Sequence, residues 1–326
     1  MRYGPPETER SRATAPTVHR SWRRPRIRPL IIVGGQGNVA HGALRLAELV
    51  ARRDRVNAHV VALMRPVEIP RWVLGAADAD ALQEGLRQQR HDRLRRQVHA
   101  IVGRSSYFST EVLVSDSIRA LRDAALESRA EYVLVGLDDL NAPDRLRNEQ
   151  LVLRLAHVVG RPVLAVPRGC AALPMRALVA VDGDPSGEVA AHAAARMLAP
   201  GGTLTLAHVV PVGEGDELDT RDPLAPPARD AAERLERLAS ALRAIGHLAV
   251  ETEVLQGDPA TVLLELTGDP KWELIACGMR RGSGRRTPGM DSIAAAVLGG
   301  TSGAAVLIAP PVEDVRSRGP RGGGDR

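Results

Sequence analysis

The residues with the clearest chemical potential lie in one stretch of the chain, at 273–308. Its apolar start predicts a buried strand, its Gly- and Arg-rich middle a loop, and the small residues after Ser292 a helix that leads into a second buried strand. The N–H groups of such a loop and of a helix N-terminus carry partial positive charge and lack intrahelical acceptors. This order of elements predicts a site for an anion such as phosphate.

Arginines would strengthen this anion site. The segment from Gly278 to Arg286 contains four arginines, and guanidinium groups bind phosphate oxygens through paired N–H donors. A solvated basic loop is the alternative interpretation, since almost every basic residue of the chain is an arginine. The residues of this stretch that we assign to the candidate site are Gly278, Arg280, Arg281, Gly282, Ser292 and Ile293.

The elements around this site occur twice along the chain, as short Val-rich strands that alternate with helices. Such alternation predicts βαβ units, a parallel sheet and helices on both of its faces. We therefore expect an α/β fold of two repeated doubly wound domains, each with a five-stranded, mostly parallel sheet flanked by helices. The expected strands are 30–34, 58–64, 110–114, 132–136 and 162–166 in the first copy, and 177–183, 203–210, 250–258, 273–278 and 304–308 in the second; the expected helices are 40–53, 80–102, 117–129, 149–159, 187–198, 229–245, 260–266 and one that begins at Ser292.

Other candidate ligand groups stand at the ends of these strands, because ligands of open α/β sheets bind outside the carboxyl ends of strands. One strand ends at Ala180–Val181–Asp182. The Asp182 carboxylate could accept hydrogen bonds from a ribose hydroxyl or a base amine. The alternative is that Asp182 opens a turn or caps the next helix, although Asp184 could also cap it.

Two more strand ends complete the candidate site. Val209 could contact the edge of a base through its backbone, whereas the neighbouring His208 is expected to pack rather than to catalyse. Gly257 could allow close approach of a ligand, in a turn where Asp258 and Pro259 would cap and begin the following helix.

Composition sets the size and the class of the protein. The chain has 326 residues, 44% hydrophobic but only 2% aromatic, which suits two aliphatic cores under α/β layers. We expect a first domain at 29–168 and a second at 175–311. The first 28 residues hold eight Arg against two Glu and predict a disordered basic tail, and 312–326 predicts another tail. We expect no nucleic-acid partner except through the basic tail.

The remaining composition argues against metal and membrane functions. Cys170 and Cys277 are far apart, show no metal-ligand spacing, and Cys277 fits a buried strand. No apolar run is long enough to cross a bilayer, and the N-terminal segment lacks the apolar centre of a secretory signal. We expect a soluble, cytoplasmic protein with no membrane insertion and no metal site of its own.

Both halves resemble universal stress protein domains, on the segments LVAVDG, LAHVV, GDPA and 278–308 of the second half. Members that bind ATP carry Gly, two residues, Gly, nine residues, and then Gly followed by Ser or Thr. This chain keeps the spacing, with Gly278 and Ser292 matching and with Arg281 and Asp291 in place of two glycines. The resemblance implies that Asp182 contacts the nucleoside, that Val209 lies near the base, and that Gly257 belongs to the turn before the third helix.

The two replacements predict a weakened ATP site. Gly282 could partly substitute for the glycine missing at Arg281. At a helix N-cap, the Asp291 carboxylate would accept the N–H bonds that a phosphate needs, and it would place negative charge beside the anion. We expect ATP as a possible ligand of the second domain, with Mg²⁺ only as its companion.

The first domain has diverged further from this pattern. Its first strand is followed by Gly34–Gly35, with no Asp at the matching position. Asp138 and Asp139 follow its fourth strand, and Glu149–Gln150 occupies the Gly-Ser position. Since these carboxylates would repel a triphosphate, we expect no nucleotide in the first domain.

The main hypothesis from the sequence is a tandem universal stress protein with a regulatory function in the stress response and no enzymatic activity, although slow ATP hydrolysis stays open. Its domains would pair within the chain through the strands at 162–166 and 304–308, and the chain could form a homodimer. The first rival is a nucleotide-free scaffold for interaction or dimerisation. The second is an adenylate-forming enzyme, for which the sequence shows no catalytic set.

Overall fold

A computed structural model describes residues 29–33, 40–68, 76–137, 142–211, 226–244, 246, 248–279, 293–300 and 303–312. The tail predicted at 1–28 and nearly all of the tail predicted at 312–326 lie outside these ranges. The same is true of positions 34–39, 138–141 and 280–292, on which several of the sequence predictions fall.

The first half of the chain alternates strands and helices as its hydrophobic pattern predicts. One predicted boundary is wrong here: the helix predicted at 149–159 begins earlier, at Ala142. Pro143 is its second residue, where a missing backbone N–H removes no helical hydrogen bond. The elements are β1 (Pro29–Val33), α1 (His41–Asp54), β2 (Ala58–Met64), α2 (Ala76–Val102), β3 (Phe108–Val114), α3 (Ile118–Glu127), β4 (Tyr132–Leu137), α4 (Ala142–Val159) and β5 (Val163–Pro167).

The second half repeats this order with shorter helices near its end. Its first and third helices begin with an Asp cap followed by Pro, the arrangement expected at Asp184–Pro185 and Asp258–Pro259. The elements are β6 (Arg176–Ala180), α5 (Pro185–Met197), β7 (Thr203–Val210), α6 (Pro226–Arg243), β8 (Ala249–Gln256), α7 (Pro259–Thr267), β9 (Leu274–Gly278), α8 (Ile293–Gly300) and β10 (Ala305–Ala309).

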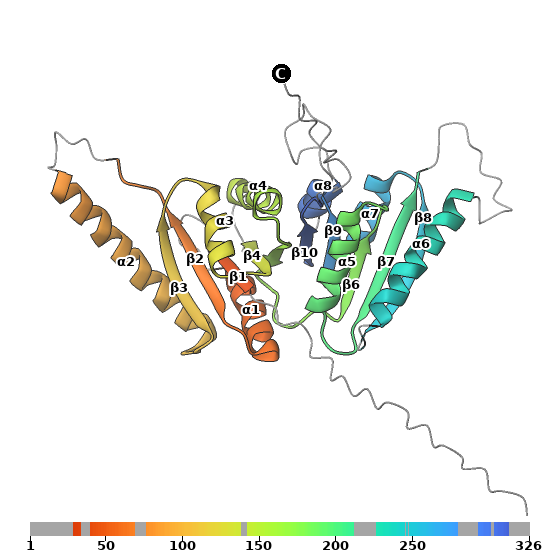
Figure 1. Cartoon of the computed structure of the whole chain (residues 1–326), viewed down its shortest axis with the longest axis horizontal. Helices are drawn as coiled ribbons and strands as arrows, with labels where there is room; N and C mark the ends of the chain where they lie inside the picture. The colour runs from red at the N-terminus through yellow and green to blue at the C-terminus, as the bar shows by residue number, and fades with distance from the viewer. Residues whose placement is uncertain are drawn as a thin grey trace, which may run out of the picture.

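All of these strands form one sheet of ten, in the order β3-β2-β1-β4-β5-β10-β9-β6-β7-β8 (Figure 1). Each half contributes five strands that pair in parallel, and the strand orders of the halves are mirror copies. The third strand of each half, β3 and β8, stands at an edge of the sheet, as their alternating sequences predict. The predicted α/β class, with a mostly parallel sheet flanked by helices, is confirmed.

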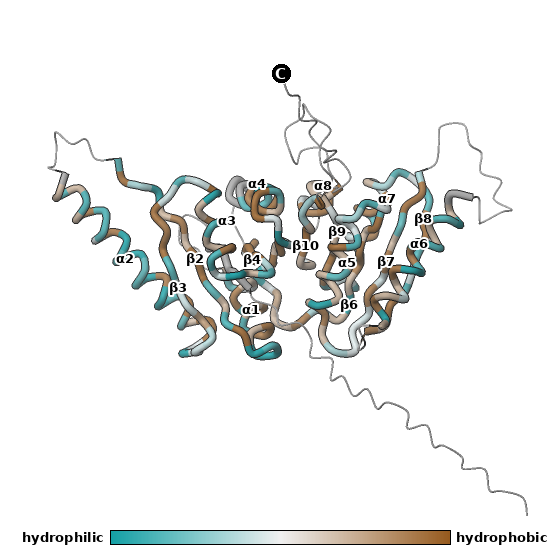
Figure 2. Tube along the Cα trace, in the orientation of Figure 1, coloured by the Kyte–Doolittle hydropathy of each residue, from teal (hydrophilic) through white to brown (hydrophobic). Residues whose placement is uncertain are grey.

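Helices cover both faces of this sheet. One buried cluster joins the strands to α1, α2, α5 and α6, and a second cluster on the opposite face joins them to α3, α4, α7 and α8. Because both clusters include residues of β5 and of β10, neither core stops at the boundary between the halves. Figure 2 shows the central strands as apolar, whereas the outward parts of α2 are hydrophilic. No helix in the described ranges combines the length and apolar character that crossing a membrane requires.

The halves join through an antiparallel pairing of their last strands. Val306, Leu307 and Ile308 of β10 stand opposite Ala165, Leu164 and Val163 of β5, and all six side chains are buried. This is the only antiparallel pair among the described strands. β10 therefore runs opposite to β5 where the two halves meet.

Polar contacts on the α1 and α5 side reinforce this junction. The Arg53 guanidinium donates to the carbonyls of Arg196 and Leu198, 3.0 and 3.2 Å away, at the C-terminal end of α5. It also pairs with Asp54 at 2.9 Å. Cations are favourable at this end of a helix, where carbonyls lack intrahelical donors.

A buried tyrosine makes a second polar contact between the halves. The Tyr132 hydroxyl donates to the Ala193 carbonyl of α5 at 2.9 Å. Burial raises the pKa of Tyr132 to about 12, so the hydroxyl keeps the proton that it donates. The Arg196 guanidinium lies 5.7 Å from the centre of the Tyr132 ring, within cation–π range.

Replacing Arg53 should weaken the junction. Arg53→Ala leaves two carbonyls of α5 without this donor, and we expect the free energy of unfolding to fall by about 1–3 kcal/mol. Arg122→Ala is the matched control, because Arg122 is 42% exposed and pairs with the neighbouring Asp123, which is 54% exposed, on the surface of α3. The control should lie within about 0.5 kcal/mol of the parent in urea unfolding. Equal losses in the two variants would contradict a cross-half function for Arg53.

Candidate functional site

The carboxyl ends of β6 and β9 bring two of the predicted site residues to the same rim of the sheet. In the parallel register Ala180 stands opposite Cys277, so Asp182 and Gly278 follow from adjacent strands. Burial, and after it the negative charge of Asp182, raises the pKa of the Cys277 thiol to about 12. Cys277 is therefore a protonated core residue, and the Asp182 carboxylate is near enough to act on it.

Asp182 does not serve as the cap of α5. The cap is Asp184, whose side chain accepts from the N–H of Ser186 at 2.8 Å, and Pro185 begins the helix. Asp182 accepts the N–H of Asp184 at 3.0 Å, which closes the turn after β6, and its side chain is exposed at the rim. Of the structural interpretations of Asp182, opening the turn is confirmed and capping the helix is wrong. Its hydrogen bonding to a nucleoside stays a prediction.

Gly278 allows the N-terminus of α5 to approach β9. A β-carbon at Gly278 would lie 2.3 Å from the Ser186 hydroxyl oxygen and 2.5 Å from the carbonyl carbon of Ser186. The buried Ser186 donates in turn to the Asp184 carboxylate at 2.6 Å. The sequence analysis did not assign Ser186 to the site, although the Asp-Pro-Ser sequence of a helix start was a signal for it.

The end of β7 directs backbone groups past the end of β6. Successive residues of a strand point their N–H and C=O groups to opposite sides. The Ala207 carbonyl accepts from the N–H of Val181, which directly follows β6, and the Val210 carbonyl accepts from the N–H of Gly257, which directly follows β8. The N–H and C=O of Val209 therefore point to the side of β6, beyond the N–H of Val181.

His208 has a structural contact at this rim. Its Nδ1 lies 2.6 Å from the carbonyl oxygen of Val181, so that nitrogen is the donor, and the half-buried ring ties the end of β7 to the end of β6. This agrees with the expectation that His208 packs rather than catalyses.

Gly257 lies two strands away from Asp182, at the end of β8. Its φ of 136° is a conformation that residues with side chains rarely adopt, and it makes the turn into α7. Asp258 caps that helix by accepting from the backbone and the hydroxyl of Thr261, both at 2.9 Å. These hydrogen bonds hold the pKa of Asp258 below its usual value.

Part of the predicted site lies outside the described residues. Arg280, Arg281, Gly282 and Ser292 belong to the unplaced segment 280–292. Ile293 is the first residue of α8 and is half-buried. The structure thus brings Ala180, Val181, Asp182, Val209, Gly257 and Gly278 to one rim of the sheet and places the start of α8 after Gly278 in the chain.

The corresponding region of the first half is built differently. Glu149 and Gln150 occupy the middle of α4, since the helix begins at Ala142. A helix interior presents no unbonded N–H groups to a phosphate. Asn148 of the same helix donates to the carbonyl of Gly136 at 3.1 Å, at the end of β4. Asp138 and Asp139 lie outside the described residues.

One feature of the strand-end geometry is nevertheless common to both halves. A β-carbon at Gly136, the counterpart of Gly278, would lie 2.3 Å from the side chain of Ala40, just before α1. Close approach of the first helix to the fourth strand is therefore a property of the fold. It does not by itself indicate a ligand.

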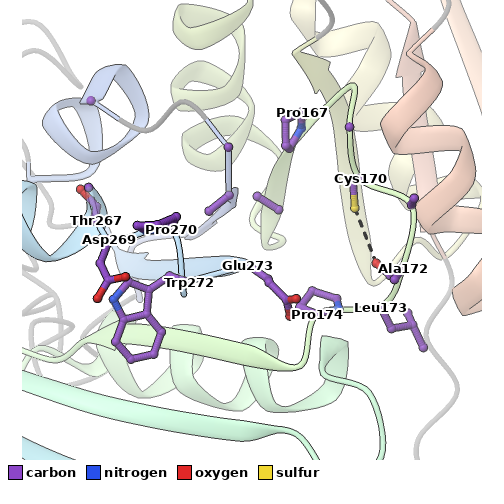
Figure 3. A pocket seen from close by; sticks show the side chains of 17 residues that line it. Pro167, Cys170, Ala172, Leu173, Pro174, Thr267, Asp269, Pro270, Trp272 and Glu273 are labelled. Atoms are coloured by element: carbon purple, nitrogen blue, oxygen red, sulfur yellow. Dashed lines mark hydrogen bonds between the residues drawn. The ribbon is translucent and has the colours of Figure 1, made fainter.

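A cavity of about 430 Å³ lies away from the candidate site (Figure 3). Its walls come from the connection between β5 and β6 and from the turns that precede β9 and β10. It therefore opens at the amino ends of the second-half strands, whereas Asp182 and Gly278 stand at their carboxyl ends. Cys170 and Trp272 line this cavity, and burial raises the pKa of Cys170 to about 11.

Within the described ranges, no three His, Cys, Asp or Glu side chains lie close enough together to hold a metal ion. The second half is an open α/β sheet whose candidate ligand groups gather beyond the carboxyl ends of β6, β7, β8 and β9.

Comparison with known proteins identifies this domain. Residues 175–310 match the sequence model of the universal stress protein family. The chain therefore contains a universal stress protein domain in its second half, and the resemblance that the strand ends and the glycine spacing suggested is confirmed. No curated protein matches the chain in sequence.

Solved structures extend the likeness of fold to both halves. A universal stress protein from Archaeoglobus fulgidus DSM 4304 has a TM-score of 0.58 at 14% identity, covering 87% of this chain and 98% of that one. A candidate universal stress protein from Pseudomonas aeruginosa UCBPP-PA14 has a TM-score of 0.50 at 16% identity, covering 89% of this chain and 95% of that one. At these identities the comparison shows the fold alone.

The close approach at Gly278 generates a test of this geometry. Gly278→Ala must displace backbone atoms of Ser186, and we expect it to lower the free energy of unfolding by about 1–3 kcal/mol. Gly85→Ala is the control, because nothing lies within 4 Å of a β-carbon at this position in α2. The control should gain about 0.5–1 kcal/mol from its higher helix propensity. A Gly278→Ala variant as stable as the parent would show that α5 is not held against β9.

Proposed function

We propose that this chain is a tandem universal stress protein that acts as a regulator of the stress response and binds an adenine nucleotide, such as ATP, through its second half. The observation that carries the proposal is the shared rim of Asp182 and Gly278 on adjacent strands. A nucleoside-binding carboxylate and the start of a phosphate loop must lie at one rim for a single nucleotide to reach both.

Each group at the rim would have a separate task. The Asp182 carboxylate accepts hydrogen bonds from the ribose hydroxyls, and the backbone of Val209 contacts the base edge. The loop after Gly278, with its arginines and the N-terminus of α8, holds the phosphates. Mg²⁺ enters only together with the triphosphate, whose oxygens supply part of its ligands.

The proposed nucleotide site is regulatory and not an enzyme active site. At the described part of the rim, the imidazole of His208 is already bonded to the Val181 carbonyl. Asp258 is engaged as a helix cap. Occupancy by nucleotide would shift a conformation or a contact with a partner, because β9 and α5 touch the ligand region and also pack at the junction of the halves.

The first half would bind no nucleotide and would act as the structural partner of the second. The continuous α4 supports this proposal, because it removes the helix N-terminus from the position where the second half begins α8. We further propose that the protein works in the cytoplasm, that it can form a homodimer, and that only the basic segment 1–28 could contact nucleic acid.

A nucleotide-free scaffold of the same fold is the second candidate. It is favoured by Arg281 and Asp291, which replace glycines of the ATP-binding pattern. The two candidates differ in one measurable property, the affinity for ATP.

Equilibrium dialysis with ATP and Mg²⁺ would test the nucleotide proposal. The parent should bind one ATP per chain, and Asp182→Asn should weaken binding by about ten- to hundred-fold, because it removes a charged acceptor worth about 1.5–3 kcal/mol. Asp184→Asn is the matched control, since asparagine caps a helix about as well as aspartate. The absence of binding by the parent at millimolar ATP would favour the scaffold.

A second variant tests the proposed obstruction by Asp291. Asp291→Gly removes a carboxylate that competes with phosphate for N–H donors at the start of the helix, so ATP should bind about ten-fold more tightly. Asp269→Asn, in the turn before β9, changes the net charge equally and should leave ATP affinity unchanged. An Asp291→Gly variant with the affinity of the parent would refute the obstruction.

A further inference from the structure

Three polar side chains on the outer strands of the first half form a connected group. His59 lies on β2, and Ser109 and Glu111 lie on the neighbouring edge strand β3 (Figure 1). The Ser109 hydroxyl is 2.8 Å from Nδ1 of His59, and the Glu111 carboxylate is 2.8 Å from Nε2. The imidazole thus bridges a hydroxyl and a carboxylate.

The register of the two strands creates this group. His59 stands directly opposite Ser109, and Val61 stands opposite Glu111. Because side chains two residues apart share a face of a strand, Ser109 and Glu111 both flank the imidazole. Fifty positions separate His59 from Ser109 in the chain, so no local sequence pattern reveals the group.

Hydrogen bonding fixes the tautomer of the neutral imidazole. An ionised carboxylate can only accept, so the proton of neutral His59 must lie on Nε2, facing Glu111. Nδ1 then has a lone pair and accepts the hydrogen of the Ser109 hydroxyl. The nitrogen that faces the serine is then unprotonated, as a general base requires; Nδ1 and Nε2 exchange the positions that they have in the Ser-His-Asp triad.

A cavity of about 310 Å³ opens beside the group. Asn57, Glu127 and Ser128 line it together with the three residues of the group. Asn57 lies two residues before His59 in the chain, directly before β2, and lines the same cavity. Its side-chain amide is a donor of the kind that stabilises an oxyanion. The Ser128 hydroxyl is bonded to the carbonyl of Ala124 at 2.7 Å and is not the nucleophile.

We propose that Ser109, His59 and Glu111 form a hydrolytic site for small esters that carry a positive charge. Ser109 Oγ attacks the ester carbonyl while His59 Nδ1 takes its proton, and Asn57 donates to the oxyanion. His59 passes the proton to the leaving alcohol as the ester bond breaks. Water, activated by His59, then hydrolyses the acyl-serine and restores the hydroxyl. Glu111 acts through His59 as a positioning residue that stabilises the imidazolium.

Charge around the cavity selects the substrate class. Glu127 lines the cavity at the last residue of α3, where the helix dipole also adds negative potential. Glu111 contributes a second carboxylate. A cationic group bound there would offset the repulsion that these charges exert on the developing oxyanion, and the modest volume limits the substrate to a small ester.

The second half shows what an ordinary contact at this place looks like. β7 and β8 are the second-half counterparts of β2 and β3. Between them, the Thr205 hydroxyl donates to the Glu251 carboxylate at 3.3 Å. Such a cross-strand hydrogen bond satisfies polar groups without a base. The first half has in addition a histidine between the hydroxyl and the carboxylate, and a cavity beside them.

Labelling of the full chain with a fluorophosphonate, followed by peptide mass spectrometry, tests the nucleophile. The label should attach to Ser109, disappear in Ser109→Ala and persist in Ser128→Ala, whose hydroxyl lines the same cavity. His59→Gln should slow labelling by about 100-fold or more, the usual contribution of a general base. Glu111→Gln keeps an acceptor and should still slow labelling, whereas Glu111→Asp should restore part of the rate. Equal rates for Glu111→Gln and the parent would reduce Glu111 to a structural contact.

Hydrolysis assays then test the substrate class. The parent should release thiol from acetylthiocholine faster than from the neutral ethyl thioacetate, and Glu127→Gln should reduce that preference. A chain that is not labelled, or that is labelled equally well without Ser109 or without His59, overturns the proposal. An equal rate with the two thioesters overturns the assigned charge preference. The outcome is independent of nucleotide binding, since the two sites share no residue.

Discussion

The antiparallel pairing of β5 with β10 is the contact on which the rest of the structure depends. Without it, each half would expose a flat apolar edge strand, and such edges invite association with other chains. With it, ten strands form one sheet and both layers of helices pack over a continuous core. Arg53 and Tyr132 add hydrogen bonds from the first half to α5 of the second. The halves are therefore parts of one packed body.

The two halves carry different groups at the carboxyl ends of their strands, although they share one sheet. In the second half, the carboxyl rim has Asp182 beside Gly278, with the helix cap left to Asp184. In the first half, the corresponding loop is partly replaced by α4, and the notable polar group stands instead at the start of β2 and β3. One fold thus presents two chemically different surfaces.

The sequence predicted the architecture well because alternating strands and helices leave few topologies. β2 and β7 have the predicted bounds, and the Asp-Pro turns at 184–185 and 258–259 begin helices as expected. The start of α4 was missed because Ala142–Pro143 can begin a helix or continue a loop. The adjacency of Asp182 and Gly278 followed from the expected sheet. The His59–Ser109 contact could not be predicted, because it depends on the exact register of two strands far apart in the chain.

Hydrogen–deuterium exchange of the whole chain, with and without ATP and Mg²⁺, tests the central claim most directly, because it reports on both halves at once. The account predicts that ATP slows exchange in peptides that cover the turn after β6 and the end of β9, at 180–187 and 276–279. Peptides from the first half should exchange at unchanged rates, apart from the strand β5 at the junction. Unchanged exchange at 180–187 under saturating ATP, or equal protection around β1 and β4, would contradict it.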